Sequence, residues 1–293
     1  MAKSKTEEYP VLWLQGGGCT GCSVSLLNSV SPSLRNILID EIIPGKHLNV
    51  RFHPTVMAGA GDAAVAELER TRDHAKGAYV LVVEGSVPLA AGGAYAMIGE
   101  RQGEGISMHS WVRSLSRDAL AVIAVGTCSA FGGIPSGEPN PTESVSVQQV
   151  LSTEGINTPL INVPGCPPHP DWFVGTVASL LLQGLPKDGD LDEYLRPKTF
   201  YGQLIHENCP RRAYFDEGKF AEKLSDPYCL YEVGCKGPVT HADCPIRLWN
   251  NGVNWCVGSG APCIGCVEPT FPDVVAPIYE KITDEALPNI GAE

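Results

Sequence analysis

Residues 78–84 read AYVLVVE and residues 119–126 read ALAVIAVG, and both runs are apolar, rich in branched side chains and bounded by turn residues. Runs of this kind are typical of strands buried on both faces of a parallel sheet. The runs at residues 11–15 and 160–163 have the same character. Helical patterns follow these runs at residues 23–30, 62–76, 107–117, 145–151 and 171–182. Strands that alternate with helices predict an open, doubly wound α/β domain over residues 1–190.

The chain changes character after Leu185. Residues 186–190 read PKDGD and are the predicted linker, and residues 186–293 contain seven of the eleven cysteines. A disordered tail is one interpretation of this part of the chain. Trp249, Trp255 and the spaced cysteines favour instead a smaller, loop-rich domain at residues 191–293 that is organised by a cofactor.

The charge balance and hydropathy exclude several classes of protein. Asp and Glu number 33 against 21 Lys and Arg, a net charge of −12, which disfavours a nucleic-acid-binding role. No apolar run reaches the roughly 18 residues that a transmembrane helix needs. Residues 1–10 contain neither an apolar signal core nor a twin-arginine pair. The sequence as given therefore predicts a cytoplasmic protein, or a periplasmic one whose leader has been removed.

The glycine-rich turn after residues 11–15 matches the dinucleotide-binding pattern G-x-G-x-x-G at Gly16, Gly18 and Gly21. Asp40 lies about twenty residues farther on, where a ribose-binding acid would stand. A nucleotide-dependent dehydrogenase is therefore one hypothesis. Against it, the pattern contains Cys19 and is followed at once by Cys22, and a thiolate would repel a pyrophosphate. We expect these glycines to let the backbone pass close to a group held by the two sulfurs.

The cysteines are spaced as metal ligands rather than as a disulfide framework, because their number is odd and the chain is long. Four of them follow predicted strands, at Cys19, Cys22, Cys128 and Cys166. Ligands bind beyond the carboxyl ends of the strands in an open α/β sheet, so these four predict one site, and four thiolates suit a 4Fe-4S cluster. The alternative is that they are buried, inert cysteines.

Two further sets of four candidate ligands lie in the C-terminal third. The second set is His206, Cys209, Cys229 and Cys235. The third set is Cys244, Cys256, Cys263 and Cys266. Four thiolates also make a structural zinc site, so a zinc-stabilised interaction protein is a competing hypothesis. Eleven cysteines and one histidine supply the twelve ligands that three clusters need, with none left over.

Several unusual motifs resemble those of the small, electron-transferring subunit of nickel-iron hydrogenases, and they extend over nearly the whole chain. In the first half they are WLQ at 13–15, CTGCS at 19–23, EGSVP at 84–88 and GTC at 126–128. Farther on they are NVPGCPPHP at 162–170, HENCP at 206–210, GCKGP at 234–238 and CIGC at 263–266.

The resemblance implies a flavodoxin-like domain that holds a proximal 4Fe-4S cluster on the first set. It implies a distal 4Fe-4S cluster on the second set and a medial cluster on Cys244, Cys263 and Cys266. The nickel-iron centre would belong to a separate large subunit in an obligate heterodimer or a higher oligomer, and this chain would hold no catalytic residue. Electrons would pass from the proximal to the medial and distal clusters and on to a cytochrome, a ferredoxin or a quinone-linked protein.

The chain departs from the family pattern in two respects. Many members have proline at the position of Cys256 and a 3Fe-4S medial cluster, so a thiol there predicts a 4Fe-4S cluster, as in the selenium-containing branch. Gly21 and Gly133 stand where oxygen-tolerant members carry extra cysteines, so a six-cysteine proximal cluster is not expected. A subunit of a quinone-linked complex related to hydrogenases is the remaining hypothesis, but such relatives generally keep only the proximal-type site.

Overall fold

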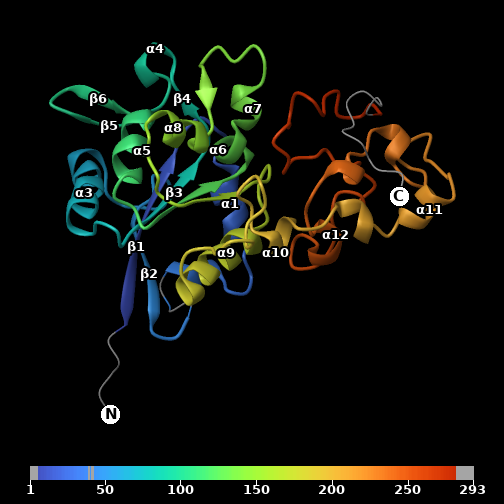
Figure 1. Cartoon of the computed structure of the whole chain (residues 1–293), viewed down its shortest axis with the longest axis horizontal. Coiled ribbons are helices and arrows are strands. Elements are labelled where there is room, and N and C mark those ends of the chain that lie inside the picture. The colour runs from blue at the N-terminus through green and yellow to red at the C-terminus, as the bar shows by residue number, and fades with distance from the viewer. Residues whose placement is uncertain (1–5, 39, 41–42, 282–293) are drawn as a thin grey trace.

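The computed structural model describes residues 6–38, 40 and 43–281. Five strands form one parallel sheet in the order β2-β1-β3-β7-β9 (Figure 1). Their bounds are β1 (Glu7–Gln15), β2 (Lys46–Phe52), β3 (Val80–Glu84), β7 (Ala121–Val125) and β9 (Leu160–Val163). This is the flavodoxin-like strand order, in which the chain reverses direction across the sheet between β1 and β3. The predicted fold class is therefore confirmed.

Side chains that alternate along each strand fill two separate apolar cores. Val80 and Val82 on β3 pack on the face that is covered by α1 and α9, whereas Leu81 and Val83 pack on the face that is covered by α3, α5 and α8. All four are at most 2% exposed, as expected for a central strand with helices on both sides. The helices are α1 (Gly21–Leu27), α3 (Gly61–His74), α5 (Met108–Ser116), α8 (Val147–Thr153) and α9 (Pro170–Gln183).

Each of these five helices corresponds to a predicted one, and the four predicted strands are also found. The sequence did not predict β2, an edge strand in which Leu48, Val50 and Phe52 alternate with Asn49 and Arg51, so that it contains no continuous apolar run. It also missed the hairpin of β5 (Met97–Arg101) and β6 (Glu104–Ser107), whose side chains are mostly exposed. Neither β2 nor this hairpin contains a continuous run of aliphatic residues like those of the central strands, so neither was recognised in the sequence.

Short elements complete the sheet region. They are α2 (Leu34–Leu38), β4 (Val87–Pro88), α4 (Ala90–Gly93), α6 (Thr127–Phe131), α7 (Gly133–Ser136), β8 (Ser144–Val145) and α10 (Lys198–Tyr201). Strands β4 and β8 form an antiparallel pair. The backbone of Asn162 donates to the carbonyl of Leu195 at 2.9 Å, so the chain still contacts β9 well after α9. The boundary that we place between residues 190 and 191 remains a prediction.

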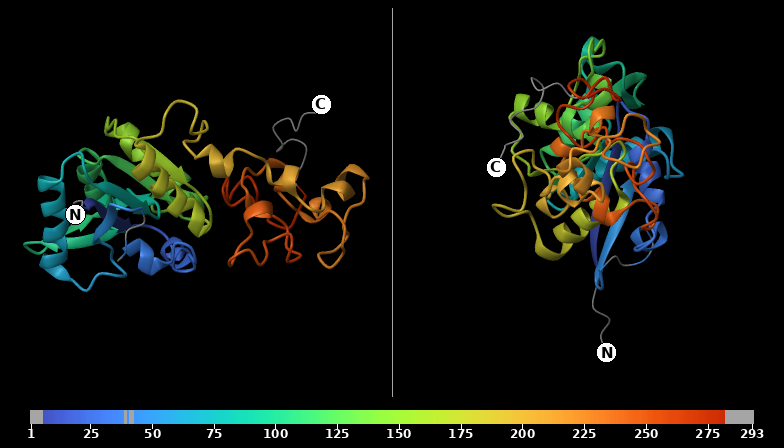
Figure 2. Two further views of the ribbon diagram at one scale, coloured as in Figure 1. Left: turned by 90° about the horizontal axis from the view of Figure 1, so that it is seen from below. Right: turned by 90° about the vertical axis from the view of Figure 1, so that its right-hand side faces the viewer.

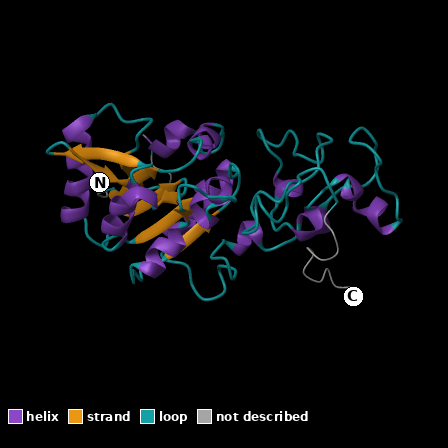
Figure 3. Cartoon of the chain, turned by 90° about the horizontal axis from the view of Figure 1, so that it is seen from above, coloured by secondary structure: helices purple, strands orange, loops and turns teal. Residues whose placement is uncertain are grey.

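Residues 202–281, here called the C-terminal region, lie at one end of the elongated molecule (Figure 2) and consist mostly of loops (Figure 3). Their regular elements are η1 (Ile205–Asn208), α11 (Arg212–Asp216), η2 (Tyr231–Val233), η3 (Gly237–Val239) and α12 (Cys244–Arg247). Polar contacts attach this region to α9: Trp172 Nε1 donates to Asp243 at 2.7 Å, and Arg247 pairs with Asp171 at 3.0 Å. Within the described ranges, no helix is both long and apolar enough to cross a bilayer.

Candidate metal centres

The first set of cysteines lies at the carboxyl edge of the sheet. Cys19 and Cys22 follow β1, Cys128 belongs to α6 after β7, and Cys166 follows β9. Burial raises the pKa of the Cys22 thiol, and negative charge on Glu84 and on the other three cysteines adds to the effect. Burial also raises the pKa of Cys128, to about 11, with Cys166 as the next contributor. The four thiols are thus near enough to interact electrostatically, and bound iron would favour their thiolate forms.

Two glycines make room for the thiols of this set. Gly126 has φ +86°, and a Cβ there would lie 2.4 Å from the sulfur of Cys22. Gly133 has φ +54°, and a Cβ there would lie 2.9 Å from the backbone nitrogen of Cys128 and 3.1 Å from its sulfur. A side chain at either position would displace a candidate ligand, so both the backbone conformation and the space require glycine. These close approaches form a cradle that fits a cluster held by the thiols.

The glycine-rich turn between β1 and α1 packs against its own chain. Gly17 and Ser86 exchange backbone hydrogen bonds of 2.9 and 2.8 Å. A Cβ on Gly16 would lie 2.5 Å from the carbonyl oxygen of Ser86. The glycines therefore leave room for the segment that follows β3. This packing explains the glycine-rich turn without a bound pyrophosphate.

A buried carboxylate, for which no role was predicted, supports the start of α1. Glu84 is 3% exposed and accepts hydrogen bonds from Trp13 Nε1 at 2.9 Å, from the backbone of Ser23 at 3.1 Å and from Gln15 Nε2 at 3.1 Å. Because Ser23 follows Cys22 directly, these bonds fix the backbone that carries that thiol. A charged residue at the end of an otherwise apolar strand is the signal that could have identified it.

The second set lines a small cavity in the C-terminal region. His206, Cys209, Cys229 and Cys235 all contribute to its wall. Burial lowers the pKa of His206, and the positive charge of Arg212 lowers it further, so the neutral imidazole that can bind a metal is favoured. Its Nε2 atom is buried and has no hydrogen-bond partner among the described residues. A buried, unpartnered imidazole nitrogen among three thiols fits a metal ligand.

The third set brings together one buried thiol on Cys263, two half-buried thiols on Cys244 and Cys266, and one exposed thiol on Cys256. The pKa of Cys263 is raised, first by its interaction with the thiol of Cys256 and then by burial. Burial raises the pKa of Cys244, and negative charge on Cys266 and Cys263 raises it further. Cys256 is exposed, and its thiol interacts with that of Cys263.

Hydrogen bonds join the three sets in a definite spatial order. The hydroxyl of Thr127, which directly precedes Cys128 of the first set, donates to the backbone carbonyl of Cys266, in the third set. The backbone of Cys263, also in the third set, donates to the sulfur of Cys235, in the second set, at 3.3 Å. The third set therefore lies between the first and the second. Within the described residues, no three His, Cys, Asp or Glu side chains converge on a single ion position.

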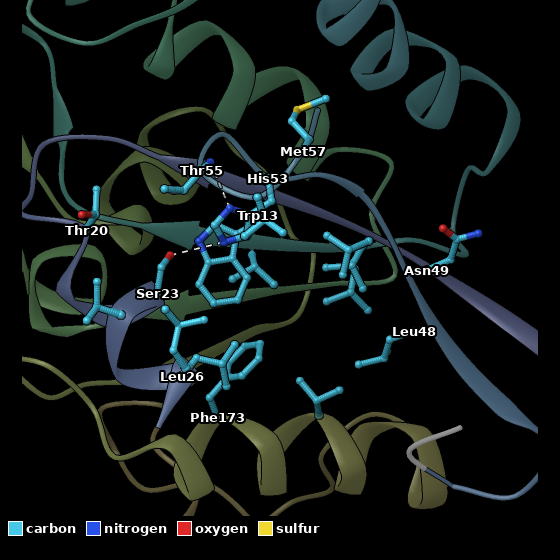
Figure 4. A pocket seen from close by; sticks show the side chains of 18 of the residues that line it. Trp13, Thr20, Ser23, Leu26, Leu48, Asn49, His53, Thr55, Met57 and Phe173 are labelled. Atoms are coloured by element: carbon cyan, nitrogen blue, oxygen red, sulfur yellow. Dashed lines mark hydrogen bonds between the residues drawn. The ribbon is translucent and has the colours of Figure 1, made fainter. Parts of the chain in front are cut away.

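An apolar cavity of about 380 Å³ opens beside the first set, between β1, β2, α1 and α9 (Figure 4). Trp13, Ser23 and His53 form its polar end, and Ser23 Oγ lies 3.3 Å from His53 Nε2. Burial lowers the pKa of His53, so its neutral form is favoured. Val24 and Leu27 line the cavity and are also more than half exposed at the surface. An exposed apolar rim of this kind suits contact with another protein.

Comparisons with known proteins agree with this arrangement in both halves of the chain. Residues 201–279 match the family model of the C-terminal part of the NiFe/NiFeSe hydrogenase small subunit. Residues 19–180 match the model of the NADH ubiquinone oxidoreductase 20 kDa subunit, so the sheet region is shared with a wider group of redox proteins. This second match is consistent with the hypothesis of a quinone-linked complex, but it does not extend to the C-terminal region.

Several full-length relatives extend the similarity over both regions. The chain is 48% identical to the periplasmic [NiFeSe] hydrogenase small subunit of Desulfomicrobium baculatum, over 93% of this chain and 87% of that protein. It is 41% identical to the periplasmic [NiFe] hydrogenase small subunit of Solidesulfovibrio fructosivorans, over 92% and 81%. The solved structure of the reduced, active Ni-Fe-Se hydrogenase from Desulfomicrobium baculatum matches with a TM-score of 0.87 and 47% identity, covering 94% of this chain and all of that one. The chain belongs to the family of hydrogenase small subunits of the nickel-iron and nickel-iron-selenium type.

Proposed function

We propose that this chain carries three iron-sulfur clusters and passes electrons between the H2-activating centre of a large subunit and an external redox acceptor. The observation that carries the proposal is the order of the ligand sets. The third set is hydrogen-bonded to Thr127, the neighbour of Cys128 in the first set, on one side and to Cys235 of the second set on the other. When bound, the clusters supply one-electron redox chemistry. The chain itself supplies ligands, spacing and a buried environment.

The ligands are proposed set by set. A proximal 4Fe-4S cluster is held by Cys19, Cys22, Cys128 and Cys166, and a distal 4Fe-4S cluster by His206, Cys209, Cys229 and Cys235. A medial 4Fe-4S cluster is held by Cys244, Cys256, Cys263 and Cys266. The interaction between the thiols of Cys256 and Cys263 supports Cys256 as the fourth medial ligand, as distinct from the three-ligand site of a 3Fe-4S cluster.

The proposed docking surface for the large subunit surrounds α1. Val24, Leu27 and the nearby Val30 are each at least 55% exposed, although all are apolar. Cys19, the exposed thiol of the first set, lies just before this helix. Electrons must enter from a centre that this chain does not hold, so the proximal cluster belongs at that interface, which should be large and obligate.

The acceptor is proposed to dock at the other end, beside the second set. Candidates are a cytochrome, a ferredoxin or a quinone-linked protein. Because two similar small subunits are named as periplasmic, we propose the periplasm as the compartment of the mature protein. Cell fractionation with an antibody against this chain tests that location, and a signal confined to the cytoplasm would contradict it.

Metal analysis of the purified heterodimer tests the cluster proposal. Anaerobic protein should contain about twelve iron per small subunit, with a matching amount of acid-labile sulfide. Stoichiometric zinc in colourless protein would instead favour the zinc-stabilised interaction protein. This chain purified alone should show no hydrogen uptake with a viologen dye, and hydrogen uptake by the isolated chain would contradict the assignment of the active site to the partner.

A further inference from the structure

A buried lysine lies where the second and third ligand sets meet. Lys236 is 2% exposed and follows Cys235 directly in the chain. Its backbone donates to the carbonyl of Cys263 at 2.7 Å, and the backbone of Cys263 donates in turn to the sulfur of Cys235 at 3.3 Å. Lys236 is thus attached to one ligand of the proposed distal cluster and to one of the proposed medial cluster.

The ammonium group of Lys236 is held by a neutral partner. Its Nζ donates to the backbone carbonyl of Glu280 at 2.6 Å, and none of the carboxylates in the described ranges lies within ion-pair distance of it. Arg196 is buried to the same degree but pairs with Asp192 at 2.7 Å and Glu268 at 3.2 Å. A buried cation without a carboxylate is strongly unfavourable unless another anion compensates it.

The anions that would compensate this charge are thiolates of both sets. Burial lowers the pKa of Lys236, whereas negative charge on Cys235 and Cys263, and to a lesser extent on Glu280, opposes that shift. Cys235 and Cys263 belong to different sets, so this one ammonium group interacts with two sites. Sulfur-ligated iron clusters are anionic, and their potentials depend on nearby charge and on burial.

We propose that the Lys236 ammonium is shared by the distal and medial clusters and raises the reduction potential of both. The inference rests on the proposed function. A cation stabilises the more negative, reduced form of each cluster, and the effect is strong because the site is buried. In the transfer between these clusters, the reduced medial cluster would give up one electron and be oxidised, and the distal cluster would accept that electron and be reduced. The single charge of Lys236 therefore raises the reduction potentials of the medial cluster, the electron donor, and of the distal cluster, the acceptor, together.

Redox-titrated electron paramagnetic resonance of the purified heterodimer tests the proposal. Lys236→Met removes the charge and keeps most of the side-chain volume, Lys236→Gln keeps a donor without charge, and Lys236→Arg keeps the charge. Both neutral variants should shift the distal and medial potentials to lower values, the Arg variant should stay near the parent, and the proximal potential should not move. Lys281→Met is the matched control, because Lys281 lies on the same segment as Glu280 but its side chain is 45% exposed beside Glu232.

Several outcomes would overturn the inference. Unchanged distal and medial potentials in the neutral variants would do so, as would an equal shift of the proximal potential. If both neutral variants failed to assemble while Lys236→Arg assembled normally, Lys236 would be required for folding and not for setting the cluster potentials. The iron content of the parent protein tests the proposed function separately. A parent protein without clusters would contradict the proposed function, whereas a parent with clusters and unshifted variants would contradict only the role of Lys236.

Discussion

The strand β3 and the cysteine-rich loops of the C-terminal region bury different kinds of side chain. Along β3, Val80 to Val83 are continuous aliphatic residues packed between two layers of helices. In the C-terminal region the buried side chains include Cys229, Cys235, Cys263 and Lys236. No helix in the described part of that region exceeds the five residues of α11, whereas α3 and α9 each have fourteen.

This difference indicates two sources of stability in one chain. Aliphatic burial stabilises the sheet region in the absence of any cofactor. The C-terminal region also buries apolar side chains such as Leu230, Trp255 and Phe271. Because its short helices contribute few backbone hydrogen bonds and its candidate ligands are thiols, it should nevertheless depend on bound clusters for much of its folding free energy. The contrast can be tested by perturbing each region separately.

The largest effect is expected when iron is removed. Prolonged treatment of the heterodimer with an iron chelator under reducing conditions should abolish hydrogen-exchange protection across residues 202–281. Amides of β3 and β7 should remain protected, because their partners are other strands. Equal loss of protection in both regions would contradict the proposed difference between them.

A smaller but still large effect is expected from Leu81→Ala. Leu81 is fully buried in β3, and its truncation should lower the local free energy of opening of the sheet by about 3 kcal/mol. Hydrogen exchange of β3 amides in the heterodimer measures this change. Leu182→Ala on α9, where the side chain is 62% exposed, is the control and should leave exchange nearly unchanged. Iron content should stay at the parental value in both variants.

The parts of the fold that were predictable from sequence are those with strong apolar patterns. β3 and β7 were identified because central strands are aliphatic on both faces, and β9 because it is buried along its whole length although it lies at the sheet edge. β2, at the other edge, was missed because polar residues alternate with its apolar ones. The grouping of candidate ligands was accessible because strand ends in a parallel sheet meet at one edge. Glu84 could be recognised as a charged residue at the end of an apolar strand, but its partner Trp13 could not. The role of Lys236 was not accessible, since it depends on Glu280, far away in the chain.

A modest effect within the sheet region is expected from Ser146→Ala. Ser146 caps α8 by accepting from the backbone of Gln149 at 3.2 Å, and Gln149 accepts in return from the backbone of Ser146 at 2.8 Å. Loss of this capping box should destabilise the helix by about 1 kcal/mol. Increased exchange confined to the first turn of α8 would support the value, and Ser152→Ala, at an exposed position of the same helix, is the control.

The smallest effect on the fold, but a specific one on the cofactor, is expected from Cys256→Pro. The carbonyl of Cys256 accepts from Ser259 at 3.1 Å and from Ala261 at 2.9 Å, and proline keeps that carbonyl. Among the described residues the backbone N–H of Cys256 makes no backbone hydrogen bond, so proline removes none. Exchange protection of the C-terminal region should therefore change little.

Loss of this thiolate leaves Cys244, Cys263 and Cys266, so about one iron in twelve should be lost and the medial potential should rise. Iron counting and redox-titrated electron paramagnetic resonance of variant and parent measure both changes. A variant that retains the parental iron content and medial signal would show that Cys256 is not a ligand. A variant that loses the whole medial cluster would instead show that its three remaining cysteines cannot hold one.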